Sequence, residues 1–189
     1  MIPSVADPMQ PTHEKSAVDA ARAGEPKGFD DLYRRLAPQV TGFARARGAA
    51  DPEGICNEVF LRCFRGLSSF TGDDAAFRRW AFSITRNLLI DTHRRDQRRP
   101  DEIFRPPPEA ASPAAETEAL ANLAEEDLST LLAPLTEEQR EVIVLRLIAD
   151  LSLADTAEIV GRPVAAVKRL QARGLRRLQA EILGREVSP

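Results

Sequence analysis

The sequence has very little of the residues that build metal centres and disulfide frameworks. It contains two cysteines and two histidines among 189 residues. Cys56 and Cys63 lie seven positions apart, which is about 10 Å along a helix and too far for a disulfide bond. His13 and His93 are isolated from each other and from the cysteines. We therefore expect no metal site and no disulfide, as in proteins of the reducing cytoplasm.

Several other signals are also missing. No apolar run approaches the roughly 18 to 20 residues of a membrane span, and the N-terminus has neither a basic start nor an apolar stretch. The sequence contains no nucleophile-elbow motif and no glycine loop of the kind that cradles phosphates. We expect a cytoplasmic protein without membrane insertion that is not an enzyme, with no catalytic residues and no cofactor.

The hydrophobic pattern is helical in the first half of the chain. After Pro26, a first-turn proline, apolar residues recur every three or four positions; they are Phe29, Leu32, Leu36, Val40 and Phe43. Asp51 and Pro52 predict the start of a second helix, with a buried stripe of Ile55, Val59 and Cys63 widened by Phe60, Phe64 and Leu67. Asp74 is expected to cap a third helix, whose stripe runs through Phe77, Trp80 or Ala81, Ile84 and Leu88. No strand-like alternation appears in this half.

A second helical unit follows in the C-terminal part. Thr136 to Gln139 forms a capping box, and the helix after it is expected to turn Val142, Leu145 and Ile148 inward. Ser152 to Asp155 predicts a short helix that Gly161 ends. Pro163 begins a last helix, whose apolar stripe is Val167, Leu170, Gly174, Leu178 and Ile182. A short helix, a tight turn and a longer helix have the form of a helix-turn-helix; the alternative is an ordinary helical hairpin.

The fold class we expect is all-α, with two small helical domains joined by a flexible linker. Residues 1–13 are proline-rich and predict a disordered tail, and residues 14–99 form the first domain. Residues 100–123 are rich in proline, alanine and acids, a composition that cannot bury a core and indicates a linker. Residues 124–189 form the second domain.

The formal net charge of −3 conceals a strong segregation of charge. Residues 78–99 carry a net charge of +5, and residues 162–177 carry six bases and no acid. The segment between these blocks is acidic, with eight acids against one arginine in residues 100–127. Two basic blocks on predicted helices favour a protein that binds a polyanion. The alternative for each block is a solvated basic face.

Three segments together carry a resemblance to a known family. EVFLRCFRGLSSF and FRRWAFSITRNLLIDTHRR, at 58–70 and 77–95, resemble region 2 of bacterial sigma factors. LTEEQREVIVLRLIADLSLADTAEIVGRPVAAVKRLQARGLRRL, at 135–178, is similar to region 4 of the same family. In its length and its two regions the chain resembles the extracytoplasmic-function (ECF) class.

This resemblance implies a protein that binds core RNA polymerase, recognises the minus-ten and minus-thirty-five promoter elements and supports promoter opening. The implied partners are core RNA polymerase, promoter DNA as duplex and as melted strand, and an anti-sigma factor. The alternative is a helix-turn-helix transcriptional regulator that never joins polymerase.

The resemblance also implies three sets of site residues. Polymerase binding is expected from Asp51, Glu53, Asn57 and Glu58. The minus-ten DNA is expected to contact Arg78, Arg79, Trp80, Arg86, Asn87, Arg94 and Arg95. The minus-thirty-five DNA is expected to contact Arg162, Lys168, Arg169, Gln171, Arg173 and Arg176.

Residues 77–95 mix aromatic rings with arginines, as single-strand binding requires. Phe82 belongs to this mixture, and for Phe77 and Trp80 the choice lies between a core side chain and a ring that stacks on DNA bases. For Asp51 and Glu53 the alternative is a solvated face whose acids favour the helix dipole.

Overall fold

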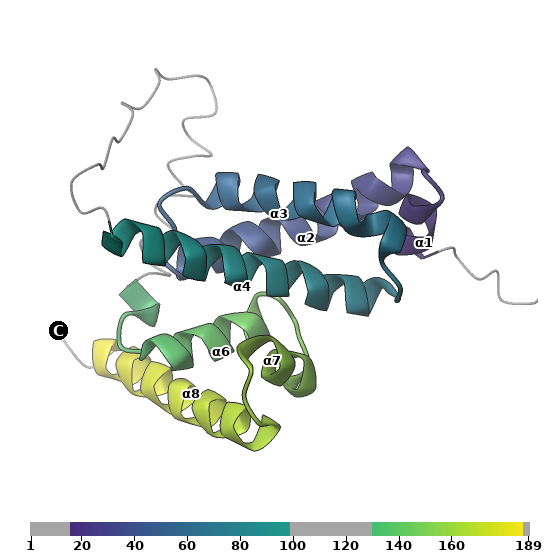
Figure 1. Ribbon diagram of the computed structural model, residues 1–189. Helices are drawn as coiled ribbons and strands as arrows, with labels where there is room; N and C mark the ends of the chain where they lie inside the picture. The colour runs from purple at the N-terminus through teal and green to yellow at the C-terminus, as the bar shows by residue number, and fades with distance from the viewer. Residues whose placement is uncertain (1–15, 99–129, 187–189) are drawn as a thin grey trace, which may run out of the picture.

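The computed structural model describes residues 16–98 and 130–186, which form two helical bundles (Figure 1). The first bundle contains α1 (Ala17–Arg22), α2 (Pro26–Ala46), α3 (Pro52–Gly66), the short 3-10 helix η1 (Leu67–Ser69) and α4 (Asp74–Arg98). The second bundle contains α6 (Glu137–Leu147), α7 (Leu153–Val160) and α8 (Val164–Glu186). Every regular element in these two ranges is helical, which confirms the predicted fold class. The expected tail (1–13) and linker (100–123) lie outside the described residues.

Local sequence signals place the starts of the helices in the first bundle. Pro26 and Pro52 are the first residues of α2 and α3. The Asp51 carboxylate accepts a hydrogen bond from the Gly54 amide at 2.8 Å, as an N-cap does. At α4 the prediction was wrong by one residue. Asp73 is the residue whose carboxylate accepts from a first-turn amide, that of Ala76, at 2.8 Å.

Asp74 instead joins α4 to two helices, α1 and α2, that lie far from it in the sequence. Its Oδ1 accepts a hydrogen bond from the Val18 amide at 3.1 Å, and its Oδ2 accepts from the Arg35 guanidinium at 2.6 Å. Burial alone would raise the pKa of Asp74, but the hydrogen bonds from Arg35, Val18 and Ser16 together lower it. The start of α4 is therefore held against α1 and α2 by an ionised carboxylate.

The core of the first bundle is built largely from phenylalanine. Phe43, Phe60, Phe77 and Phe82 are all fully buried, and the rings of Phe43 and Phe82 meet edge to face with centroids 5.8 Å apart. Phe64 was predicted to widen the buried stripe of α3, yet it is 38% exposed. It packs against Phe29, with ring centroids 3.9 Å apart, at an exposed edge of the bundle.

The second bundle is a helix-turn-helix supported by α6. Thr136 and Gln139 form the predicted capping box of α6, and the Ser152 hydroxyl accepts from the Asp155 amide at the start of α7. Gly161 ends α7 with φ of 67°, a left-handed conformation that favours glycine. A Cβ added at Gly174 would lie 3.0 Å from Cγ1 of Ile143, so this glycine allows α8 to approach α6 closely. Of the predicted stripe of α8, Ile182 is 45% exposed, because it lies near the end of the helix.

The middle of helix α6 is buried because it lies between the rest of the second bundle and the first bundle. Four consecutive residues, Val142 to Leu145, are buried. Ile148, predicted to face inward, is half-buried and approaches α2, where a Cβ at Gly42 would lie 3.4 Å from its Cγ2. Four consecutive buried residues span a full turn of the helix, so this turn needs neighbours on more than one side, and the first bundle supplies one of them.

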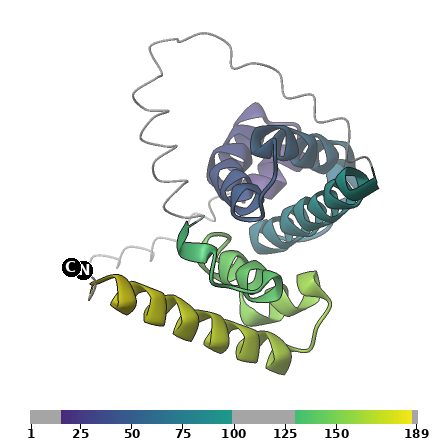
Figure 2. The same ribbon diagram turned by 90° about the vertical axis from the view of Figure 1, so that its left-hand side faces the viewer.

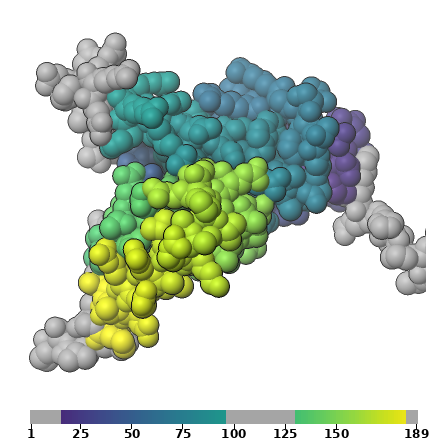
Figure 3. Space-filling model, turned by 60° about the horizontal axis from the view of Figure 1, so that its bottom comes forward, coloured from purple at the N-terminus to yellow at the C-terminus, as the bar shows by residue number. Residues whose placement is uncertain are grey.

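The two bundles lie directly against each other (Figure 3). Helices α6 and α7 contact α2 and α4 of the first bundle. Helix α8 packs on α6 and α7 along the side that faces away from the first bundle (Figures 1 and 2). Among the described helices, none is both long enough and apolar enough to cross a bilayer.

The role of Asp74 leads to a prediction about stability and its dependence on pH. Replacing Asp74 with Ala leaves the Val18 amide and Arg35 without this acceptor, so the free energy of unfolding should fall by about 1–3 kcal/mol at neutral pH. Because folding lowers the pKa of this carboxyl, its contribution is present above the ordinary value of 3.8 and is lost as pH falls below it. Urea unfolding of both proteins at pH 7 and at successively lower pH measures the effect, and the difference should shrink in acid.

The matched control is Asp30→Ala, since Asp30 pairs with Arg34 one turn along the same helix. An exposed pair of this kind contributes little, about 0–1 kcal/mol. Equal losses in the two variants, or a gap that stays constant in acid, would contradict the proposed link between α1 and α4.

Candidate nucleic-acid interface

Three arginines of α4 predicted to contact DNA lie at the contact between the bundles. Arg78, Arg79 and Arg86 are half-buried, and each pairs with an acid of the second bundle. Arg78 Nη1 lies 3.4 Å from Oδ2 of Asp150, in the loop between α6 and α7. The site residues predicted for region 2 are therefore partly covered by the domain predicted to read the duplex.

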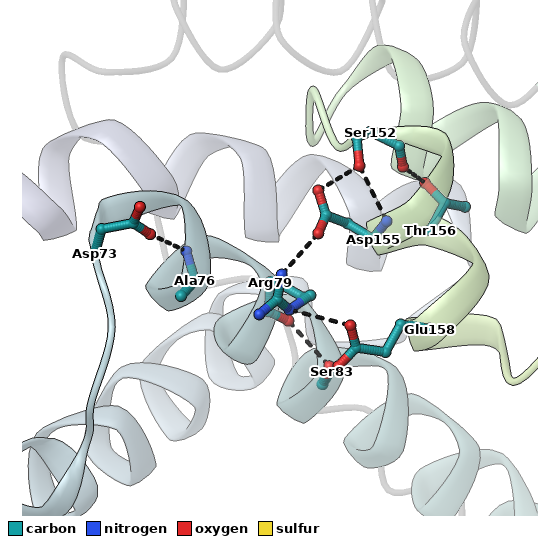
Figure 4. Close-up of polar contacts among 8 residues, drawn as sticks. All are labelled: Asp73, Ala76, Arg79, Ser83, Ser152, Asp155, Thr156 and Glu158. Carbon is teal, nitrogen blue, oxygen red and sulfur yellow. Dashed lines mark hydrogen bonds and ion pairs between the residues drawn. The ribbon is translucent and has the colours of Figure 1, made fainter.

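Arg79 makes the most elaborate of these contacts (Figure 4). Its Nη1 donates to Oδ1 of Asp155 at 2.8 Å, and its Nε lies 3.4 Å from Oε2 of Glu158, one turn further along α7. The Ser152 hydroxyl donates to the other oxygen of Asp155 at 2.5 Å. The hydrogen bonds from Ser152 and then from Arg79 lower the pKa of Asp155. Both carboxylates are thus aimed at one guanidinium.

Glu141 of α6 lies between two arginines of the first bundle. Its Oε1 accepts from Arg86 Nε at 2.9 Å and lies 3.9 Å from Arg47 Nη2. The side chains of Arg47 and Glu141 are only 10% and 11% exposed. Arg47 also donates to the Glu137 carboxylate at 2.9 Å. Charges this far from water require partners, so each depends on the other bundle for its partner.

The remaining minus-ten candidates are arranged differently. Asn87, Arg94 and Arg95 are exposed. Trp80 is half-buried, stacked on Phe70 with centroids 5.0 Å apart and set edge to face against Phe77. Phe77 and Phe82 are fully buried and therefore belong to the core. The packing of Trp80 favours a core role over a free aromatic wedge.

The residues predicted to bind polymerase lie along the outer face of α3. Asn57 is exposed, Glu53 pairs with Arg45, and Glu58 pairs with Arg62 at 2.7 Å. Asp51 is the N-cap. Sequence reasoning missed the apolar residues beside them, since Tyr33, Leu61 and Phe64 are also exposed. Leu61 gave one available signal, because it lies off the buried stripe of α3.

The basic residues of α8 are accessible. Lys168, Arg169, Arg173 and Arg176 are exposed, and Gln171 is half-buried. Arg162, in the turn before α8, is exposed and pairs with Glu138. Arg177 differs from the others because it donates to the Pro134 carbonyl and to Gln139 Oε1 in its own bundle. Helix α8 thus presents most of its charge to solvent.

The described residues contain no cluster of histidine, cysteine and acids with the geometry to hold a metal ion. Cys56 and Cys63 are buried free thiols. Burial raises the pKa of Cys63 to about 12 and, with smaller contributions from its neighbours, also raises that of Cys56. Both thiols therefore stay protonated at neutral pH and serve as core side chains.

Comparisons with known proteins confirm the predicted resemblance. The family model for Sigma-70 region 2 matches residues 32–99, and that for Sigma-70 region 4 matches residues 131–180. The chain is 30% identical to the ECF RNA polymerase sigma factor SigD of Mycobacterium tuberculosis over 93% of this chain and 86% of that protein. It is 33% identical to SigM of the same species over 91% of this chain and 87% of that protein.

Two further matches differ in coverage. The ECF sigma factor BldN of Streptomyces coelicolor is 32% identical over 85% of this chain, which spans only 62% of that longer protein. Among solved structures, CnrH in complex with the cytosolic domain of CnrY matches with a TM-score of 0.65 and 25% identity, over 89% of this chain and 96% of that one.

Sigma factors are polymerase subunits without catalytic activity of their own, and they act in transcription initiation. The two matched regions occur here in order, and the second contains the helix-turn-helix formed by α7 and α8. The chain therefore belongs to the extracytoplasmic-function class of RNA polymerase sigma factors.

Proposed function

We propose that this chain binds core RNA polymerase through α3, holds the melted minus-ten strand along α4 and reads the duplex minus-thirty-five element with α8. The observation that carries the proposal is the recognition helix. An exposed row of bases on α8 follows a turn fixed by Gly161, as a major-groove reader requires. The domains we assign are residues 14–99 for region 2, 100–123 for the linker and 124–189 for region 4.

The outer face of α3 suits a protein partner better than DNA. Its candidate residues Glu53, Asn57 and Glu58 are polar or acidic, and Leu61 and Phe64 are exposed beside them. Apolar side chains surrounded by polar ones are typical of protein interfaces, and acids repel phosphates. We assign this face, with Asp51 at its start, to core polymerase.

Helix α8 is suited to both positioning and base contact. Lys168, Arg173 and Arg176 can neutralise phosphates, and Arg162 adds a charge at the turn. Arg169 has the geometry to pair with guanine and Gln171 with adenine, if each reaches a base edge. With five or six phosphates neutralised, log affinity should fall with log salt at a slope of roughly −5.

On α4, the exposed residues Asn87, Arg94 and Arg95 are available for the melted strand, and Arg78, Arg79 and Arg86 join them once the bundles separate. Trp80 contributes by supporting Phe70 and Phe77, or by leaving that packing to stack on a base. Arginines next to aromatic rings are the combination that single strands require.

The chain's location and its regulation follow from these partners. Core polymerase and promoter DNA are cytoplasmic in bacteria, so we infer a cytoplasmic protein. The matched CnrH structure contains the cytosolic domain of CnrY, and an anti-sigma factor is correspondingly the regulator we propose for this chain.

The experiment that tests this function combines core polymerase, the purified chain and genomic DNA fragments of the source organism. Mapping the 5′ ends of the transcripts should reveal start sites that share two upstream elements and that require the chain. The alternative, a regulator that never joins polymerase, predicts duplex binding without any chain-dependent start site.

A first substitution test concerns the duplex reader. Replacing Lys168, Arg169 and Arg173 with Ala should abolish selective binding to the upstream element and weaken the salt dependence of binding. Binding to core polymerase should remain, because these side chains lie on α8. Since Lys168 and Arg173 are the phosphate contacts among the three, the salt slope itself should become shallower by roughly 2, and electrophoretic mobility shift at several salt concentrations provides the measurement.

The matched control, Arg22→Ala with Lys27→Ala and Arg34→Ala, removes the same charge from exposed positions of α1 and α2. Its affinity for the upstream element should stay within about twofold. If the control lost as much affinity as the α8 variant, net charge rather than recognition by α8 would explain the binding.

A second substitution test concerns promoter opening. Asn87→Ala with Arg94→Ala and Arg95→Ala should reduce initiation on duplex promoters about tenfold or more, and much less on the same promoters melted beforehand. The reason is that contacts to the separated strand offset the loss of base stacking only when the duplex must be opened. Trp80 is left unchanged because its replacement would disturb Phe70 and Phe77. Equal impairment on both templates would argue against a melting role.

A further inference from the structure

We propose that the acidic edge formed by Glu141 of α6 and by Asp155 and Glu158 of α7 occupies the α4 arginines needed by the melted promoter strand, and so inhibits single-strand binding in the free chain. The proposal rests on the function assigned above to α4. It adds a regulatory contact within the chain. It also implies that the free chain can bind the duplex element through α8, which is accessible, but not the melted strand through α4, whose arginines are covered.

The competition follows from the donors involved. The nitrogens of Arg79 that face α7 are taken by Asp155 at 2.8 Å and Glu158 at 3.4 Å, and Arg86 Nε is taken by Glu141 at 2.9 Å. A phosphate bound at the same nitrogens would lie within a few ångströms of these carboxylates, where like charges repel strongly. The acidic edge and a DNA strand cannot use these guanidinium groups together.

Several features hold the acidic edge in place. Ser152 orients the Asp155 carboxylate through a hydrogen bond of 2.5 Å, and Glu141 is nearly enclosed between Arg86 and Arg47. Arg47, which is not a DNA candidate, adds its contacts with Glu137 and Glu141 to those that the α4 arginines make. Ion pairs in such surroundings fix one arrangement even where their net contribution to stability is small.

Helix α8 takes no part in this contact. Lys168, Arg169 and Arg173 are exposed, and the helix that carries them lies on the side of the second bundle that faces away from the first (Figure 2). We therefore expect duplex binding to be possible in the closed chain, whereas binding of the melted strand requires separation of the bundles. Polymerase, by holding the two domains apart, would expose the α4 arginines where the strand is melted.

The closed state can be tested without DNA, using fluorescence energy transfer in the full chain labelled at Ser68→Cys and Ala180→Cys, both exposed positions. The native thiols are buried and protonated, so they should label slowly. Arg79→Glu should lower the transfer because it places three acids together. Adding Glu158→Arg should restore it, since Glu158 is highly exposed and lies near the end of α7, where a cation is favourable. Low transfer in the unsubstituted chain would overturn the closed state. Transfer that stays unchanged in the Arg79→Glu variant would overturn it as well.

The competition is tested by anisotropy with a labelled single strand of mixed sequence and, separately, a duplex of mixed sequence. Asp155→Asn with Glu158→Gln should tighten single-strand binding about threefold to tenfold and change duplex binding less than twofold. The control, Asp19→Asn with Asp30→Asn, removes the same charge from acids paired on their own helices. Glu158→Gln alone is the second variant, because it leaves the start of α7 intact.

The outcomes separate this inference from the function it rests on. Equal tightening by the control, or equal tightening on duplex, overturns the competition. If the unsubstituted chain binds a single strand strongly and shows low energy transfer between the bundles, the closed state is wrong, but the proposed function of α4 is supported. If opening the chain with Asp155→Asn and Glu158→Gln yields no single-strand binding at all, the assignment of α4 to the melted strand fails, and this inference fails with it.

Discussion

The carboxylate of Glu141 in the second bundle pairs with Arg47 and Arg86 of the first bundle, and the position of the second bundle depends on these ion pairs. Both Arg47 and Glu141 are almost removed from water, so neither bundle can move away without exposing a charge to solvent and ending its pairing. Around this contact, Ile148 approaches Gly42, and Asp155 and Glu158 meet Arg79. The arrangement uses polar contacts that water can replace, which suits two domains that are proposed to separate when DNA binds.

Ion pairs between the bundles also determine which basic side chains of the molecule face solvent. A chain with a formal charge of −3 contains two basic segments, and they differ in how many acids lie next to them in the structure. The arginines in the first part of α4 are paired with acids of α6, of α7 and of the loop between them, while most bases of α8 face solvent. Asp155 and Glu141 of the second bundle thus pair with Arg79 and Arg86, the arginines that are proposed to bind DNA phosphates.

Features set by neighbouring residues could be predicted from the sequence. The capping box of Thr136 and Gln139, the left-handed Gly161 and the starts of α2 and α3 depend on contacts within a few positions. The choice between Asp73 and Asp74 as the cap of α4 was decided by Val18 and Arg35, which no local pattern reveals. The pairing of Arg79 with Asp155 spans 76 positions and left no signal. One signal was overlooked: the unbroken apolar run from Val142 to Leu145 already indicated a helical turn with neighbours on more than one side.

The most direct test of the account is a titration of the doubly labelled full chain with single-stranded DNA while energy transfer between the bundles is recorded. If the acidic edge and the strand compete for Arg79 and Arg86, transfer should fall as the strand binds, with the same midpoint as the binding curve. A duplex titrated in parallel should bind through α8 without changing the transfer. Single-strand binding that saturates while transfer stays constant would contradict the account, because strand and acidic edge would then be bound together.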